Sequence, residues 1–315
     1  MSYAVVTYTI DSILSLFEAV IGINSLSCDI NFVKIVASPK FSGYVHSVYH
    51  KAVNITCNTT GEMLTLLCNQ MDNGPNSLIV DLRSFENLGI EAHDWVRIKE
   101  DYLLIASRLN VQLPHSGLWR CDLPSFPDQT QMLKANLKVA TEYMKHYGKH
   151  SGMLRLCTTR GDIESTLTKM LDARVKGLLD AVAKGNSVNA FYYASRLVGL
   201  GYGLTPSGDD FLVGLFTVMN MPNSPLQSFS KWCKQIVDAA YSFTNEISYA
   251  TLIKAASGMV RESIVRFVMA LIEEYPQQMV KSLDRVLKIG STSGTDIALG
   301  ITSGFGVALK GMCER

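Results

Sequence analysis

The sequence SGDDFLVG at residues 207–214 joins a polar, glycine-containing turn to the start of an apolar helix. The sequence SGTDIALG at residues 293–300 follows the same S-G-x-D pattern, at an offset of 293 − 207 = 86 residues. In both copies an Asp lies three residues after the Ser, and apolar residues follow it. The repetition predicts two helix starts that face one site. An internal duplication and a chance likeness both remain open as its origin.

Helix capping is the simplest interpretation of both copies. Ser207 is a residue type that favours the N-cap, and Asp210 then lies at the third helical position, where its carboxylate suits the helix dipole. Thr292 or Ser293 has the same relation to Asp296. The two motifs are therefore explained in part by a purely structural role.

Capping does not explain the glycines or the doubled aspartate. Gly208 and Gly294 are poor helix formers, so they predict a ligand or another backbone close to each helix start. Free N–H groups there would bind a carboxylate or phosphate. Asp209, Asp210 and Asp296 would instead accept N–H groups or hold a divalent cation. Together these features predict a ligand with an anionic group at one end and N–H groups at the other.

Two further features extend this prediction. Gly214 and Gly300 lie about one and a half turns into each helix and suit a close helix–helix crossing, which would bring the two helix starts side by side. A polar run begins at Thr244 inside an apolar region. Its structural interpretation is a helix start capped by Thr244 or Ser248. Its functional interpretation places Glu246 and Ser248 in the wall of the same pocket.

The first 125 residues predict a β-rich, barrel-like domain. Segments 43–57, 63–68 and 77–82 are rich in apolar, β-branched or aromatic residues, and turn sequences separate them. Segments 96–105 and 110–113 are candidates for further strands, and a helix is expected over residues 10–24. Short strands at this spacing favour a small barrel or a sandwich.

Residues 114–127 are rich in Pro, Gly and Ser and predict a domain boundary. Beyond it, apolar residues recur at helical spacing, which predicts a mostly α-helical domain over residues 126–315 after the β-rich domain over residues 1–125. The fold class is therefore α+β. The expected helices cover residues 128–147, 162–183, 187–198, 225–245, 247–257, 259–274 and 277–288, with two more that begin near 207 and 293.

Composition restricts the possible partners and location. The 315 residues are 47% hydrophobic and 18% charged, with a net charge of +1, so neither nucleic acid nor an anionic membrane is an expected partner. We expect no membrane span and no secretory signal. The seven cysteines are scattered and include no C-x-x-C pair, which indicates reduced thiols in a cytoplasmic protein.

The sequence GLTPSGDD at residues 203–210, together with TSGTD at residues 292–296, resembles a bacterial family of unknown-function domains. That family includes a subunit of oxamate carbamoyltransferase from anaerobic allantoin catabolism. KAVNI at residues 51–55 and GEMLTL at residues 61–66 match it as well, although the subunit has a His where this chain has Gly208. The resemblance implies conversion of oxalurate and phosphate to oxamate and carbamoyl phosphate, with other carbamoyltransferase subunits as partners.

The predicted site follows from the motifs and this resemblance. Asp209 and Asp210 are the predicted catalytic residues. The predicted substrate-binding residues are Thr205, Ser207, Gly208, Thr292, Ser293, Gly294, Asp296, Glu246 and Ser248. No cofactor is predicted, and Mg²⁺ on the aspartates is the alternative. Two other functions remain open: a non-catalytic ligand-binding or scaffold subunit, and a Mg²⁺-dependent enzyme acting on another small amide or carboxylate.

Overall fold

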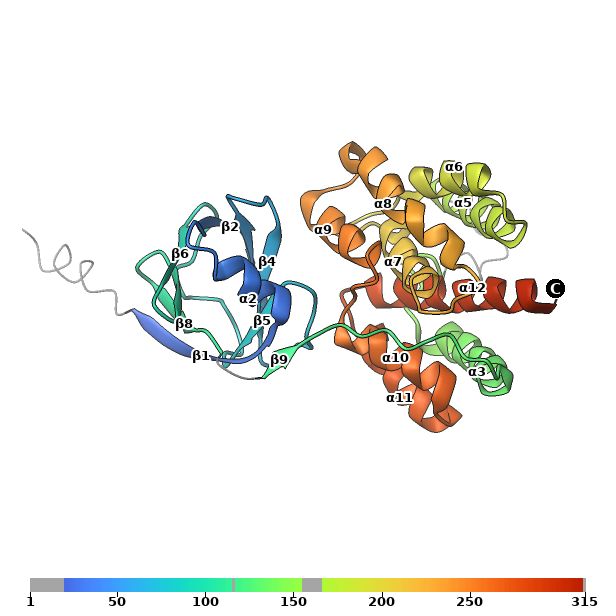
Figure 1. Ribbon diagram of the computed structural model, residues 1–315, viewed down its shortest axis with the longest axis horizontal. Helices are drawn as coiled ribbons and strands as arrows, with labels where there is room; N and C mark the ends of the chain where they lie inside the picture. Colours follow the sequence, from blue (N-terminus) through green and yellow to red (C-terminus); the bar gives the residue numbers. More distant parts are fainter. Residues whose placement is uncertain (1–19, 115–116, 155–165, 314–315) are drawn as a thin grey trace, which may run out of the picture. The chain divides into compact units, whose positions relative to one another are not determined.

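The strands of the N-terminal unit close into a barrel in the computed structural model (Figure 1), which describes residues 20–114, 117–154 and 166–313. The order around the barrel is β1-β5-β4-β3-β2-β6-β7-β8, and β1 closes it by pairing with both β5 and β8. The strands are β1 (Ile21–Asp29), β2 (Gly43–Tyr49), β3 (Ala52–Cys57), β4 (Met63–Cys68), β5 (Ser77–Val80), β6 (Trp95–Lys99), β7 (Tyr102–Ile105), β8 (Leu109–Gln112) and the short β9 (Leu118–Trp119).

Alternation of apolar residues explains why these strands share one core. Val53 and Ile55 of β3 and Leu64 and Leu66 of β4 belong to the same buried cluster, as alternate residues of a strand point to one face. Closure also removes the exposed sheet edges on which other chains would pair. The predicted barrel and the predicted hairpin between β3 and β4 are therefore confirmed.

The helix expected over residues 10–24 is wrong where the structure describes it. Residues 10–19 lie outside the described residues, and Ile21 begins strand β1. A short helix, α2 (Ile30–Val36), follows that strand. The reason for the error is that β1 pairs with strands distant in the sequence, and such pairing overrides the local helical pattern.

Helices make up most of the second unit. The structure divides the chain into Met1–Arg120 and Cys121–Arg315, each with its own apolar core. The α-helices of the second unit are α3 (Gln131–Tyr147), α5 (Thr166–Ala183), α6 (Ser187–Leu197), α7 (Ser207–Met219), α8 (Ser230–Ala239), α9 (Glu246–Ala255), α10 (Glu262–Glu273), α11 (Pro276–Leu287) and α12 (Ser293–Cys313). A barrel followed by helices confirms the α+β class. No helix in the described ranges has the length and apolar character needed to cross a membrane.

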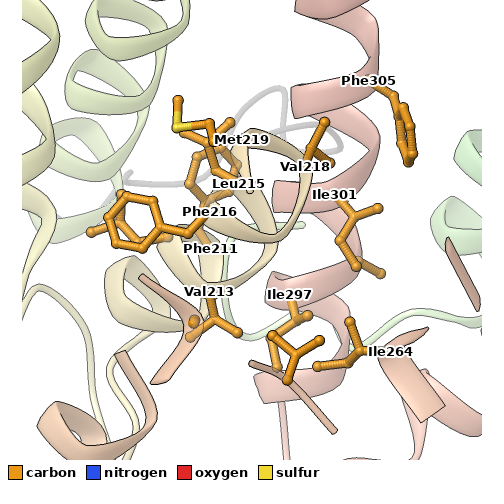
Figure 2. Packing of buried hydrophobic residues seen from close by; sticks show 14 of the residues in the cluster. Phe211, Val213, Leu215, Phe216, Val218, Met219, Ile264, Ile297, Ile301 and Phe305 are labelled. Atoms are coloured by element: carbon orange, nitrogen blue, oxygen red, sulfur yellow. The ribbon is translucent and has the colours of Figure 1, made fainter. Parts of the chain in front are cut away.

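Helices α7 and α12 form the centre of this unit. Every residue of α7 is buried, as expected for a helix that other helices surround. Helix α12 contacts α7, α5, α3 and α11, and Figure 1 shows α12 between the α5–α6 pair and the α3–α11 pair. Figure 2 shows the apolar side chains around the two helices, including Phe211 and Leu215 from α7 and Ile297 and Ile301 from α12.

The crossing of α7 and α12 depends on two glycines. A Cβ on Gly214 would collide with the carbonyl oxygen of Ile297, and a Cβ on Gly300 would collide with that of Phe211. Each contact becomes the other when the 86-residue offset between the copies is applied, so the two helices meet around an approximate two-fold axis. The predicted crossing is confirmed, and it places the two helix starts next to each other.

Candidate functional site

The start of α7 differs from the predicted capping box. Pro206, with φ −56° and ψ 143°, occupies the N-cap, so Ser207 is the first helical residue and Asp210 the fourth. The carbonyl oxygen of Pro206 accepts the N–H groups of Asp209 and Asp210 at 2.9 and 3.1 Å. The prediction of Ser207 as N-cap was wrong because the extended backbone of Pro206 already supplies the turn. Ser207 and Asp210 therefore do not form a capping box with each other.

The start of α12 repeats this arrangement. Ser293 is the first helical residue, and the carbonyl oxygen of Thr292 accepts the N–H groups of Thr295 and Asp296 at 2.9 and 3.1 Å. Thr292 thus corresponds to Pro206, and Asp296 corresponds to Asp210. The likeness between the two copies is one of three-dimensional structure as well as of sequence.

The glycines after the two serines pack against backbone. The N–H of Gly208 donates to the carbonyl oxygen of Leu200 at 2.8 Å, and that of Gly294 donates to Ile289 at 3.0 Å. A Cβ on either glycine would collide with the last turn of the preceding helix, α6 or α11. Another backbone, one of the two predicted neighbours, therefore explains these glycines. The prediction that these N–H groups are free to bind an anion is wrong.

The serines and aspartates of the two helix starts are hydrogen-bonded crosswise. Ser293 of α12 bonds the carboxyl group of Asp210 in α7, and Ser207 of α7 bonds that of Asp296 in α12. The Thr205 hydroxyl bonds Asp210 as well and lies 2.7 Å from the Ser293 hydroxyl. These five side chains form what we call the crossed cluster, and they bring both S-G-x-D motifs together.

The two carboxyl groups of the crossed cluster are deeply buried. Asp210 is 3% exposed and Asp296 is fully buried. Burial raises the pKa of Asp296 to about 7, against the opposing effect of bonds from Met153 and Ser207. Burial also raises the pKa of Asp210 well above its ordinary value, and the negative charge of Asp296 adds to that shift. The Oδ2 atom of each has no hydrogen-bond partner among the described residues.

A loop after α3, absent from the predicted site, contributes to this cluster. The N–H of Met153 donates to Oδ1 of Asp296 at 2.6 Å, and the N–H of Lys149 donates to the Thr295 hydroxyl at 2.9 Å. A Cβ on Gly152 would collide with the Asp296 carboxyl group. The only sequence signal for this contact was the glycine, which is not distinctive in a loop.

Asp209 belongs to a different set of contacts. Its carboxyl group accepts the N–H of Gly199 at 2.6 Å and the hydroxyls of Thr244 and Ser248 at 2.5 and 2.6 Å. Burial still raises its pKa, although all three bonds oppose that shift. The α9 N-cap is Asn245, not Thr244 or Ser248 as predicted, because both hydroxyls bond Asp209 instead. Asp209 therefore ties the start of α7 to the start of α9.

Glu246, the remaining predicted residue, is not one of the crossed-cluster side chains. Glu246 is exposed at the first position of α9, unlike the buried carboxyl groups of Asp210 and Asp296. Within the described ranges, no group of three or more His, Cys, Asp or Glu residues is placed to hold a metal ion. The chemistry that the crossed cluster can perform is hydrogen bonding and proton transfer by two carboxyl groups supported by three hydroxyls.

Comparison with known families covers both units. Residues 197–305 match the family model for the oxamate carbamoyltransferase subunit AllH, and residues 24–118 match the model for the AllH family N-terminal domain. No solved structure matches the chain. The first match includes both helix starts, and the second includes nearly the whole barrel. The chain therefore belongs to the AllH family, that of the oxamate carbamoyltransferase subunit.

Proposed function

We propose that this chain is a subunit of a carbamoyltransferase that converts oxalurate and phosphate to oxamate and carbamoyl phosphate. A phosphate oxygen bonds to the carbamoyl carbon, and the bond from that carbon to the nitrogen of oxamate breaks. The phosphate hydroxyl loses its proton, and the departing nitrogen gains one. Family membership across both units supports this reaction, and it implies that the chain works with other subunits.

The observation that carries the proposal is the buried pair of Asp210 and Asp296 in the matched region. Burial raises the pKa of both carboxyl groups, and that of Asp296, at about 7, lies close to neutral pH, where an ordinary aspartate is ionised. One carboxylate then accepts the phosphate proton, and one carboxylic acid donates a proton to the departing nitrogen. General acid–base catalysis of this kind contributes about 10²–10⁴-fold to a rate.

Several of the predicted residues take different roles in this reaction. Asp210 and Asp296 are the catalytic groups, and Ser207, Ser293 and Thr205 position them through the bonds of the crossed cluster. Asp209 was predicted to be catalytic, but here it is a positioning residue. Its carboxyl group bonds only groups of the chain itself, those of Gly199, Thr244 and Ser248. Ser248 acts with it.

Reconstitution tests this function. Phosphate-dependent formation of carbamoyl phosphate from oxalurate is measured for the other subunits with and without this chain. We expect turnover only when the chain is present. Equal turnover without it would contradict the proposal.

A non-catalytic scaffold role is the second candidate. It is favoured by the internal contacts of Asp209, Gly208 and Gly294, which need no ligand. Under this role, Asp210→Ala and Asp296→Ala lower the melting temperature of the chain but leave turnover per assembled complex unchanged. A loss of turnover by the folded variants excludes it.

A Mg²⁺-dependent reaction is the third candidate. The unpartnered oxygens of Asp210 and Asp296 are of the type that Mg²⁺ prefers, and the cation would supply charge stabilisation to the phosphate. Turnover by the assembled complex is measured with and without a chelator. Activity that is indifferent to the chelator excludes this candidate.

A further inference from the structure

Three consecutive N–H groups at each helix start are already used, those of residues 208–210 and 294–296. Gly208 and Gly294 donate to carbonyl oxygens of the preceding turns, and the next two N–H groups of each helix donate to Pro206 or Thr292. Helix starts bind anions through N–H groups that have no partner in the chain. These N–H groups are therefore not available to a carboxylate or a phosphate.

The groups left over at the crossed cluster are carboxyl oxygens, which accept hydrogen bonds when ionised and can donate one when protonated. The Oδ2 atoms of Asp210 and Asp296 are buried and have no hydrogen-bond partner in the described part of the chain. Leaving a buried oxygen without a donor is costly, so a ligand that supplies donors would be favoured there. A ligand that supplies only negative charge would be disfavoured there, because the negative charge of an ionised carboxyl group would repel it.

We propose that the crossed cluster recognises the carbamoyl group of the substrate, –CO–NH2, and that the anionic groups of the substrate bind elsewhere. This inference rests on the proposed function and deepens it. A carboxylic acid and a carbamoyl group are complementary, since the acid O–H donates to the carbamoyl oxygen and the acid carbonyl accepts an N–H. The second carboxyl group accepts the other N–H. Donation to the carbamoyl oxygen also polarises the carbon that phosphate attacks.

Thr205 and Ser293 control access to this pair. Both are half-buried, whereas Ser207, Asp210 and Asp296 are buried. Their hydroxyls are 2.7 Å apart and link the loop before α7 to the start of α12. Admission of a carbamoyl group to the buried oxygens requires this bond to open. Thr205 and Ser293 therefore act as positioning residues next to the two carboxyl groups.

The test compares ligands that share a carboxylate but differ in the carbamoyl group. Isothermal titration calorimetry is carried out on the full chain and on the assembled complex with oxamate, oxalurate, oxalate, phosphate and MgCl2. We expect oxamate and oxalurate to bind and to compete with each other. We expect oxalate, which has no N–H group, to bind about tenfold more weakly or not at all.

Variants locate the binding site. Asp210→Ala should weaken oxamate binding at least about tenfold, and Asp210→Asn, which keeps one donor and one acceptor, should retain more of it. Ser293→Ala provides a second variant if Asp210→Ala does not fold. Asp180→Asn is the control, because Asp180 of α5 forms an exposed ion pair with Lys184.

Three results would overturn the inference. They are oxalate binding as tightly as oxamate, oxamate affinity unchanged in both Asp210→Ala and Ser293→Ala, and absence of oxamate binding to the chain and the complex alike. If Mg²⁺ binds and oxamate does not, the inference is also overturned, because the cluster is then a cation site. Failure of the proposed reaction gives a different result. A complex that binds oxamate but does not convert oxalurate would support the recognition site and contradict the proposed reaction.

Discussion

Asp210 and Asp296 occupy equivalent positions in two helices, and each is bonded by the serine that begins the other helix. The positive end of each helix favours an ionised carboxyl group, but burial disfavours it. Burial is the larger effect for both residues. The cluster therefore carries protons at a pH where exposed aspartates carry none.

The stability of the chain should depend on pH through Asp296. The pKa of Asp296 is about 7 when folded, above the unfolded value of about 3.9, so the folded state binds more protons between these values. The free energy of unfolding should fall as pH rises from about 4 to about 7, by at most about 1.4 kcal/mol per pH unit for this group. Urea unfolding at several pH values measures it.

Asp296→Asn is the matched variant for this measurement. Its amide cannot titrate, so the fall in stability between pH 4 and 7 should be smaller than in the unchanged chain by this contribution. Asp210 and Asp209 retain raised pKa values in that variant and continue to contribute. Identical pH profiles for the variant and the unchanged chain would contradict the assigned pKa shift.

Asp209→Ala should destabilise the chain without removing ligand binding. The substitution leaves the Gly199 N–H and the Thr244 and Ser248 hydroxyls without their acceptor. We expect a loss of about 2–4 kcal/mol, since each buried donor without a partner costs about 1–3 kcal/mol and the neighbours relax in part. Urea unfolding gives the loss. Oxamate calorimetry at a temperature where the variant is folded shows whether binding persists.

The crossing of α7 and α12 determines whether the two helix starts meet at all. Gly214→Ala or Gly300→Ala would press a methyl group against a carbonyl oxygen of the other helix. We expect each to lower the free energy of unfolding by about 1–3 kcal/mol, the range typical of overpacked cores. Thermal and urea unfolding measure the loss.

Gly306→Ala is the control within α12. A Cβ at Gly306 would meet nothing within 4 Å, so the substitution tests helix propensity alone. Alanine is favoured over glycine inside a helix by about 0.5–1 kcal/mol, and a small gain in stability is expected. A loss as large as that of Gly214→Ala would contradict the role given to the crossing.

Local patterns predicted the elements better than their contacts. Helical spacing located α7 and α12, and the turn at residues 58–62 located the β3–β4 hairpin, because these depend on neighbouring residues. For Ser207 and Ser293, the sequence predicted only that the two helix starts lie close together, and it did not predict the bonds to the aspartate of the other helix. The bond from Met153 to Asp296 spans 143 positions in the sequence, and no local pattern encodes it. Likewise, the backbone against Gly208 could not be distinguished from a ligand.

The two units of the chain each bury an apolar core of their own. The crossed cluster draws all of its residues from the second unit. A chain limited to residues 121–315 should therefore retain its helical circular dichroism spectrum and bind oxamate with the affinity of the full chain. A folded second unit that does not bind oxamate would show that the site needs the barrel as well.

The rate of oxalurate phosphorolysis by the assembled complex, measured with Asp210→Asn, tests the catalytic pair most directly. The amide cannot exchange a proton with phosphate or with the departing nitrogen, so we predict a fall in kcat of at least about 100-fold. The Asp180→Asn complex, which changes only an exposed ion pair, should keep the original rate. Full activity of the Asp210→Asn complex would contradict the account.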